Sequence, residues 1–288
     1  MIMEALRVVL GASPVPQGSW EREARFVSTA ALRGSAEPPA EAADPADVAA
    51  RLAVRLHAVP GVRQVNVRPN GFLVIEIATP GEVVDDILAG QRPEAWRSPE
   101  TGRPPETGRS PETGRPPECG RQPHGSRCAP AGTGGGGTAA GTTGAWPDFP
   151  RTWDNPGFVV RYAYVRAGAV QRWARDLGVP TGTATGTATG TATGTARPAL
   201  LDGAFDRAVL RVLAELPSRR ESRDPGWAAY LERLAEVYHK AVEHASPIPR
   251  GDEPPSEVHA ARVRMGEAVC RVLGEGLAEL GVTPPGKI

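Results

Sequence analysis

The clearest pattern of apolar and polar positions in the chain lies between Asn155 and Gly178. Apolar residues recur there at steps of three and four, at Phe158, Tyr162, Val165, Ala169, Trp173 and Leu177. That spacing places them on one face of an α-helix. Asn155 is a favourable N-cap, Pro156 suits the first helical position, and Gly178 with Pro180 ends the segment. We therefore expect a long helix that buries this face.

Three arginines of the same helix, Arg161, Arg172 and Arg175, are predicted to lie together beside its apolar face. Periodicity alone favours a core helix with a solvated basic flank. The alternative is a helix that packs and also contacts an anionic partner.

The first ninety residues change period several times. The pattern predicts helices at 2–10, 44–57 and 79–88 and strands at 62–67 and 72–77, and leaves 20–32 ambiguous. Asn70-Gly71 is the signal for a two-residue hairpin connection between the strands. This part is therefore predicted to be a small module of helices and a β-hairpin.

Three further helical patterns follow the long helix. The first spans 201–216 and ends at Pro217, the second is capped by Asp224-Pro225, and the third is capped by Ser256 and stops at Gly281. Together with the long helix they predict a four-helix domain, and the whole chain is α+β.

Low-complexity segments separate these parts. Pro-Glu-Thr-Gly-Arg is repeated with small variations within 97–144, and Thr-Gly-Thr-Ala recurs at 181–196. Such segments bury too little apolar surface to offset the cost of ordering and are predicted to be disordered. The predicted organisation is an α/β module at 1–92, a linker at 93–145, and a helical bundle at 146–288 with a flexible insert at 180–198.

Composition restricts the function. The 33 basic and 33 acidic residues leave a formal net charge of zero, so a nucleic-acid contact would need a local basic patch. No apolar run approaches the roughly 20 residues that span a bilayer, and the N-terminal residues lack the pattern of a signal peptide. We expect a cytoplasmic protein without a membrane partner. The spacing of its three cysteines indicates no metal site, and no cofactor is implied.

The sequence of the helical part resembles that of the DALR anticodon-binding domain of arginyl-tRNA synthetases. Four segments carry the resemblance, in the order of the family: Val160-Arg161-Tyr162-Ala163-Tyr164-Val165-Arg166, Leu213 to Pro217, Tyr230 to Ala235 with Tyr238-His239, and Val272 to Leu277 with Leu280 to Pro285. The resemblance covers about 130 residues. It implies a helical bundle that binds the anticodon arm of a tRNA.

The first module is similar to the N-terminal additional domain of the same family. Gly71, Phe72 and Leu73 match the family's sequence motif on the hairpin, and Val74 replaces the usual asparagine of that motif. In the family this domain contacts the outer corner of the tRNA. The resemblance therefore implies a tRNA partner for both modules.

The resemblance implies RNA contacts at Arg161, Tyr162, Tyr164, Arg166, Arg172, Arg175 and Ile288. Tyrosine rings stack on bases and arginines meet phosphates. Two of the departures from the family affect this surface: Ile288 stands for the usual terminal Met, and Val242 for an aromatic residue. For His239 the prediction is a packed, hydrogen-bonded core histidine.

The catalytic motifs of the family are absent from this sequence. None of the five histidines lies in a His-x-Gly-His context, and neither lysine, Lys240 or Lys287, belongs to a phosphate-binding loop. No catalytic residue is predicted. Three hypotheses remain: a non-catalytic tRNA-binding protein, a protein-interaction or regulatory module on the same bundle, and an accessory part of an arginine–tRNA ligase whose catalysis is supplied by a separate synthetase chain.

Overall fold

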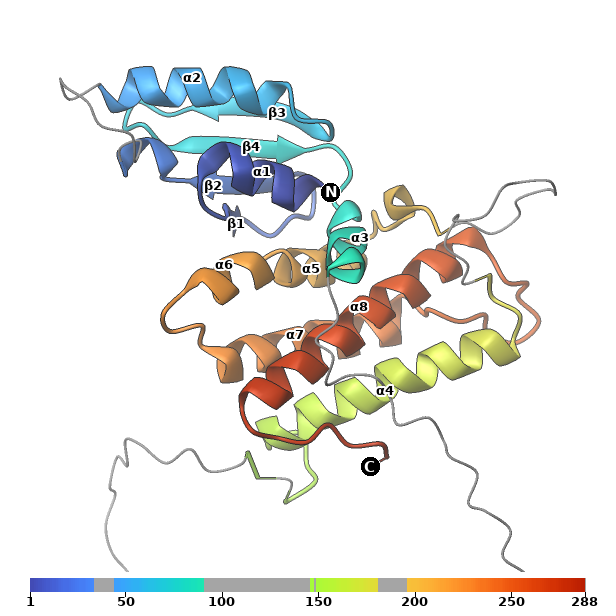
Figure 1. Cartoon of the computed structure of the whole chain (residues 1–288). Helices are drawn as coiled ribbons and strands as arrows, with labels where there is room; N and C mark the ends of the chain where they lie inside the picture. The colour runs from blue at the N-terminus through green and yellow to red at the C-terminus, as the bar shows by residue number, and fades with distance from the viewer. Residues whose placement is uncertain (34–43, 91–145, 148, 181–195, 288) are drawn as a thin grey trace, which may run out of the picture. The chain divides into compact units, whose positions relative to one another are not determined.

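The computed structural model describes residues 1–33, 44–90, 146–147, 149–180 and 196–287. The predicted linker at 93–145 and most of the insert at 180–198 lie outside these ranges, as do Cys119, Cys128 and Ile288. The described residues on both sides of the linker belong to one compact unit. As the sequence predicts, a small antiparallel sheet region is followed by a helical region, and the fold is α+β (Figure 1).

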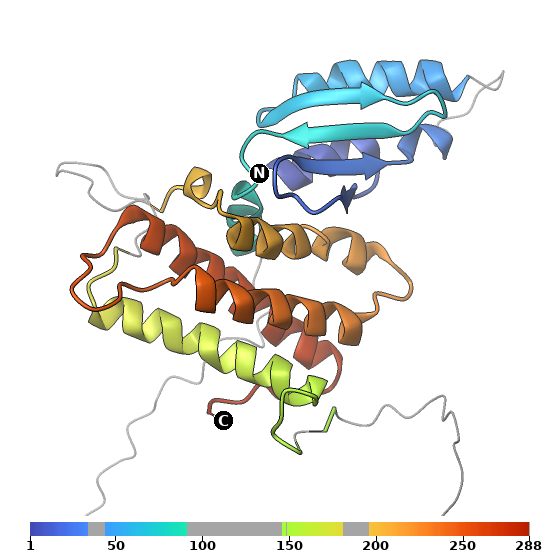
Figure 2. The same ribbon diagram turned by 180° about the vertical axis from the view of Figure 1, so that it is seen from behind.

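The first part is a four-stranded antiparallel sheet with helices. Its elements are α1 (Ile2–Leu10), β1 (Val15–Gln17), β2 (Ala24–Ser28), η1 (Ala30–Leu32), α2 (Pro45–His57), β3 (Val62–Val67), β4 (Leu73–Ile77) and α3 (Glu82–Ala89). The strand order is β1-β2-β4-β3. Figures 1 and 2 show α1 and α2 on the same face of this sheet. Leu6, Leu56 and Ile75 are buried between the two layers.

The ambiguous segment at 20–32 forms β2 and η1, and the sheet gains β1, which the sequence did not predict. Trp20 precedes β2 with a positive φ of 64° and is only 1% exposed. Its indole nitrogen donates to the Arg25 carbonyl at 3.1 Å, and its ring meets Phe26 edge to face. Burial of this large side chain outweighs the backbone strain.

The hairpin between β3 and β4 is one residue longer than predicted. Arg68 N donates to Phe72 O at 2.8 Å, so three residues rather than two form the connection. Gly71 has a φ of 77° and donates to Arg68 O, and the Asn70 side chain accepts from Phe72 N. A left-handed glycine at the third loop position is typical of three-residue hairpins.

The second part is a bundle of helices. Its elements are α4 (Pro156–Asp176), η3 (Pro198–Leu200), α5 (Ala204–Leu213), α6 (Leu216–Glu221), α7 (Trp227–His244) and α8 (Glu257–Glu279). α4 packs on both α7 and α8, and α7 also packs on α5 (Figure 2). Pro217, predicted only to end a helix, instead lies in the first turn of α6, where its missing N–H costs nothing.

The buried face of α4 differs from the predicted one. Its buried positions are mostly small or β-branched: Val159, Val160, Ala163, Ala167, Ala169, Val170 and Ala174. Trp173 and Leu177, which were predicted to be core residues, are each 49% exposed. Small side chains let α4 approach α7 and α8 closely, so the alanine positions face the core and several large rings remain outside.

Polar contacts join the helical part to the first part. Arg264 on α8 forms an ion pair with Asp85 on α3 at 2.7 Å, and Arg271 donates to Leu88 O at 3.1 Å. Ser13 donates from both its backbone nitrogen and its hydroxyl to Glu221 on α6, at 2.9 and 2.7 Å. α3 therefore lies against the bundle. Among the described helices none has the length and apolar character needed to cross a membrane.

Candidate nucleic-acid interface

The start of α4 is fixed by the side chain of Asn155. Its Oδ1 accepts from Gly157 N at 3.0 Å, as predicted for an N-cap. Its amide nitrogen donates to Pro147 O and Pro150 O at 3.1 and 2.8 Å. A Cβ at Gly157 would lie 2.4 Å from Pro147 O, so the chain before the helix approaches too closely for another residue. This contact positions the segment that carries Trp153.

Arg161 also holds the start of α4 against the segment that precedes it. Its side chain is 9% exposed and donates to Gly157 O at 3.1 Å and Trp146 O at 2.7 Å. Arg172 and Arg175 are exposed and lie at least eleven residues farther along α4, roughly 16 Å at 1.5 Å per residue. The expectation that the three arginines lie together is therefore wrong, because Arg161 turns toward the carbonyl groups before the helix.

Four aromatic rings lie close together near the start of α4. Phe158 and Tyr162 stack with 5.7 Å between centroids and 8° between planes, and Tyr162 stacks on His239 at 5.3 Å and 20°. Trp153 stands edge-on to Tyr162 and His239, at 5.6 and 5.1 Å. We call Trp153, Phe158, Tyr162 and His239 the ring cluster. Its outermost member, Trp153, is 60% exposed.

His239 is buried and hydrogen-bonded, as predicted. Its Nε2 lies 3.2 Å from Val159 O, and its Nδ1 lies 3.3 Å from Arg166 Nη1. A carbonyl needs a donor and a guanidinium needs an acceptor, so both contacts fit the neutral tautomer with the proton on Nε2. Burial lowers the pKa of His239, and the Val159 carbonyl acts in the opposite direction. Burial and the neighbouring Arg166 thus favour the neutral imidazole within the stack.

A cleft of about 340 Å³ opens next to the ring cluster. Trp153, Pro156, Val159 and His239 form its apolar and aromatic wall. The charged residues on α7 that line it are Glu232, Glu236, Lys240 and Glu243. Glu243 also lies 3.7 Å from Arg166. The cleft therefore offers flat ring surfaces together with more acceptors than cationic groups.

The other predicted contact residues are spread over α4. Arg166 is half-buried next to the ring cluster, whereas Tyr164 is half-buried and packs against the core, where burial raises the pKa of its phenol. Val242 is also half-buried against the core. Of the predicted site residues, the structure brings together Tyr162 and Arg166. Among the residues that it describes, no three His, Cys, Asp or Glu side chains gather to hold a metal ion.

Sequence reasoning did not select Trp153, and it assigned Phe158 to the core. The signal that could have found them is the group of aromatic residues at 153, 158 and 162 around the Asn155 cap. Positions 158 and 162 are one helical turn apart and must share a face.

Comparison with known proteins finds relatives of this sequence. The chain is 35% identical over 140 residues to an arginine–tRNA ligase of Clavibacter sepedonicus. The match covers 47% of this chain and 23% of the ligase, so the chain spans about a quarter of the relative's length. No protein-family model matches the sequence, and no solved structure matches it. Part of this chain is thus related in sequence to part of an arginine–tRNA ligase.

Proposed function

We propose that the chain is a non-catalytic tRNA-binding protein of the cytoplasm, related to arginyl-tRNA synthetases, whose helical bundle contacts the anticodon arm in the manner of a DALR domain. The observation that carries the proposal is the ring cluster, whose outer ring, Trp153, is well exposed. The partial identity to an arginine–tRNA ligase supports tRNA as the partner. Unpaired bases stack on such rings, typically with about 1–3 kcal/mol per base.

Within this proposal the predicted residues have different roles. Tyr162 belongs to the stacking surface, and Arg166, Arg172 and Arg175 meet phosphates. Arg161 is a positioning residue, because its guanidinium holds the backbone that carries Trp153. Tyr164 supports the packing of α4, and Ile288 remains a predicted contact outside the described residues.

The test is a direct binding measurement. Fluorescence anisotropy of labelled bulk tRNA is compared with an equal mass of duplex DNA at two salt concentrations. We expect tRNA to bind more tightly, with an affinity that falls as salt rises because counterions are released. Binding of tRNA no tighter than that of duplex DNA would contradict the proposal.

The second candidate is a protein-interaction module on the same bundle. The observation that favours it is the charge of the cleft, where Glu232, Glu236 and Glu243 outnumber Lys240. Carboxylates repel phosphates and attract cationic side chains. Recovery of a stoichiometric protein partner without RNA would favour this candidate over tRNA binding.

The third candidate is an accessory part of an arginine–tRNA ligase with catalysis in a separate chain, and the sequence relationship is its only support. Arginine-dependent exchange of pyrophosphate into ATP, measured with and without added synthetase, tests it. No change in exchange on adding the chain would remove this candidate.

A further inference from the structure

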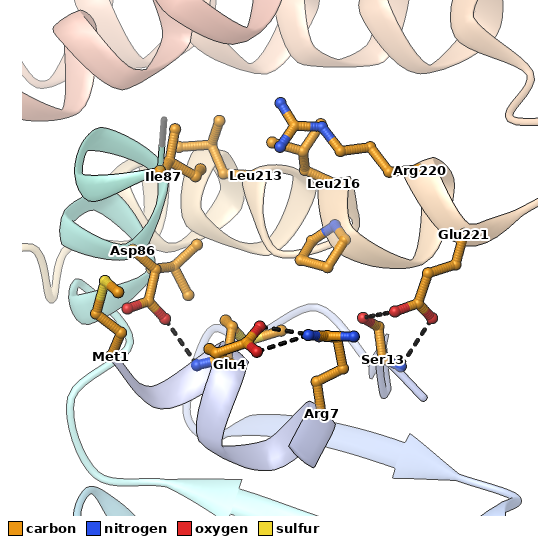
Figure 3. Close-up of a pocket in the computed structure, with 14 residues that line it drawn as sticks. Met1, Glu4, Arg7, Ser13, Asp86, Ile87, Leu213, Leu216, Arg220 and Glu221 are labelled. Carbon is orange, nitrogen blue, oxygen red and sulfur yellow. Dashed lines mark hydrogen bonds and ion pairs between the residues drawn. The ribbon is translucent and has the colours of Figure 1, made fainter. Parts of the chain in front are cut away.

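A second cavity, of about 440 Å³, lies where α1 and α3 meet α5 and α6. Figure 3 shows side chains from all of these segments directed into it. Its apolar lining comes from Val83 and Ile87 on α3, Leu213 at the end of α5, and Leu216 on α6. Its volume is within the range of small-molecule sites, and such sites favour the junctions between structural parts.

Most charged groups of this cavity are already paired within the protein. Arg7 donates from Nε and Nη2 to the two oxygens of Glu4 at 2.8 and 2.6 Å. Glu221 accepts from Ser13, and Arg220 pairs with Glu275 through Nη2. A guanidinium has five N–H donors. Arg7 and Arg220 therefore keep donors that these contacts do not use.

Asp86 differs from the other acids of the cavity. Its Oδ2 accepts from Met3 N at 2.7 Å. Its Oδ1 is buried and has no hydrogen-bond partner among the residues that the structure describes. Burial raises the pKa of Asp86, although the Met3 N–H opposes this change. A buried acceptor without a partner is unfavourable, so a bound donor would stabilise the ionised carboxylate.

These groups are arranged with opposite charges at opposite sides. Figure 3 shows Asp86 at the left of the cavity and Arg7 at its right, with Glu4 between them and Leu213 and Leu216 above, whereas Arg220 points away from Arg7. A ligand that fits this arrangement has a cationic donor, an apolar body and an anionic group.

We propose that this cavity binds a free α-amino acid with an apolar side chain. Its ammonium group donates to Asp86, and its carboxylate accepts from the N–H groups of Arg7 that Glu4 does not use. Its side chain packs on the apolar lining formed by Val83, Ile87, Leu213 and Leu216. The site involves no residue of the ring cluster and does not depend on tRNA binding. Because the ligand contacts helices from both parts of the fold, its binding stabilises their junction.

Isothermal titration calorimetry of the full chain tests the proposal with L-leucine and L-methionine as probes. Two analogues of leucine separate the contributions of its charged groups: 4-methylpentanoate lacks the amine, and 3-methylbutylamine lacks the carboxylate. We expect both amino acids to bind and each analogue to bind at least about tenfold more weakly, a difference of roughly 1.4 kcal/mol. No binding of either amino acid, or equal binding of 4-methylpentanoate, would overturn the proposal.

Variants locate the binding in this cavity. Asp86→Asn keeps an acceptor for Met3 N but removes the charge, and Ile87→Trp fills the cavity from a half-buried position. Both should lose leucine binding. Asp85→Asn is the matched control. The Asp85 carboxylate is next to Asp86 in the sequence, but it pairs with Arg264 and does not line the cavity. Leucine binding that survives both cavity variants in a folded protein would also overturn the proposal.

Discussion

The phenol ring of Tyr162 lies stacked on the imidazole of His239, with 5.3 Å between centroids and 20° between planes. The two residues come from α4 and α7, and the same imidazole contacts Val159 O at 3.2 Å. The His239 side chain thus belongs both to the contact between α4 and α7 and to the stacking surface. Conditions or substitutions that change His239 are expected to affect both stability and binding.

The first prediction concerns pH. Burial lowers the pKa of His239 below its unfolded value of about 6.5, so the unfolded chain takes up more protons as the pH falls. The stability from neutral His239 is complete above about pH 6.5 and is lost as the pH falls from that value through the lower pKa of the folded protein. Urea unfolding at a series of pH values measures this loss.

The variant His239→Gln should show a weaker loss of stability over the same pH range. Some dependence remains, because burial also lowers the pKa of His259. An equally steep pH dependence in the variant and the natural chain would show that His239 does not contribute to it.

The second prediction concerns the two kinds of arginine on α4. Arg161→Met removes two hydrogen bonds from a charged group to carbonyls and should lower the free energy of unfolding by about 2–4 kcal/mol. Arg175→Met, on the exposed surface of the same helix, should change it by less than about 0.5 kcal/mol. Denaturant unfolding of both variants checks the difference. Equal losses would contradict the positioning role of Arg161.

The third prediction compares two helical glycines. A Cβ at Gly276 would lie 2.4 Å from Leu231 Cδ2 in the core between α7 and α8, so Gly276→Ala should destabilise the fold by about 1–3 kcal/mol. At Gly168 on α4 the nearest atom would be Arg172 Nη1 at 3.7 Å. Gly168→Ala should therefore stabilise by about 0.5–1 kcal/mol. Thermal unfolding should show shifts of opposite sign, and shifts of the same sign would count against the packing described for α8.

Helix boundaries were the most predictable part of the fold. Asp44, Asn155 and Ser256 each cap the helix that follows, because capping depends on a few adjacent residues. In the capping box of α8, the third helical residue is His259 instead of the usual Glu or Gln, and its Nδ1 accepts from Ser256 N. β1 escaped prediction because three residues carry too short a pattern to detect.

The candidate site was less predictable. Periodicity placed large residues such as Trp173 in the core of α4, whereas close packing against α7 and α8 selected its alanines. The role of Arg161 depends on the carbonyls of Gly157 and Trp146, one of them fifteen residues distant in the sequence. His239 joins the ring cluster only through tertiary contact. These relationships require the three-dimensional positions of several segments.

The most direct test of the proposed function compares two exposed tryptophans in tRNA binding. Trp153→Ala removes the outer ring of the ring cluster, and Trp173→Ala removes a ring of similar exposure from the same helical region outside the cluster. We expect Trp153→Ala to weaken tRNA affinity by at least about fivefold, corresponding to the loss of one base stack. Trp173→Ala should retain the natural affinity. Equal affinities of the two variants, both folded, would contradict the assignment of the ring cluster as the tRNA-binding surface.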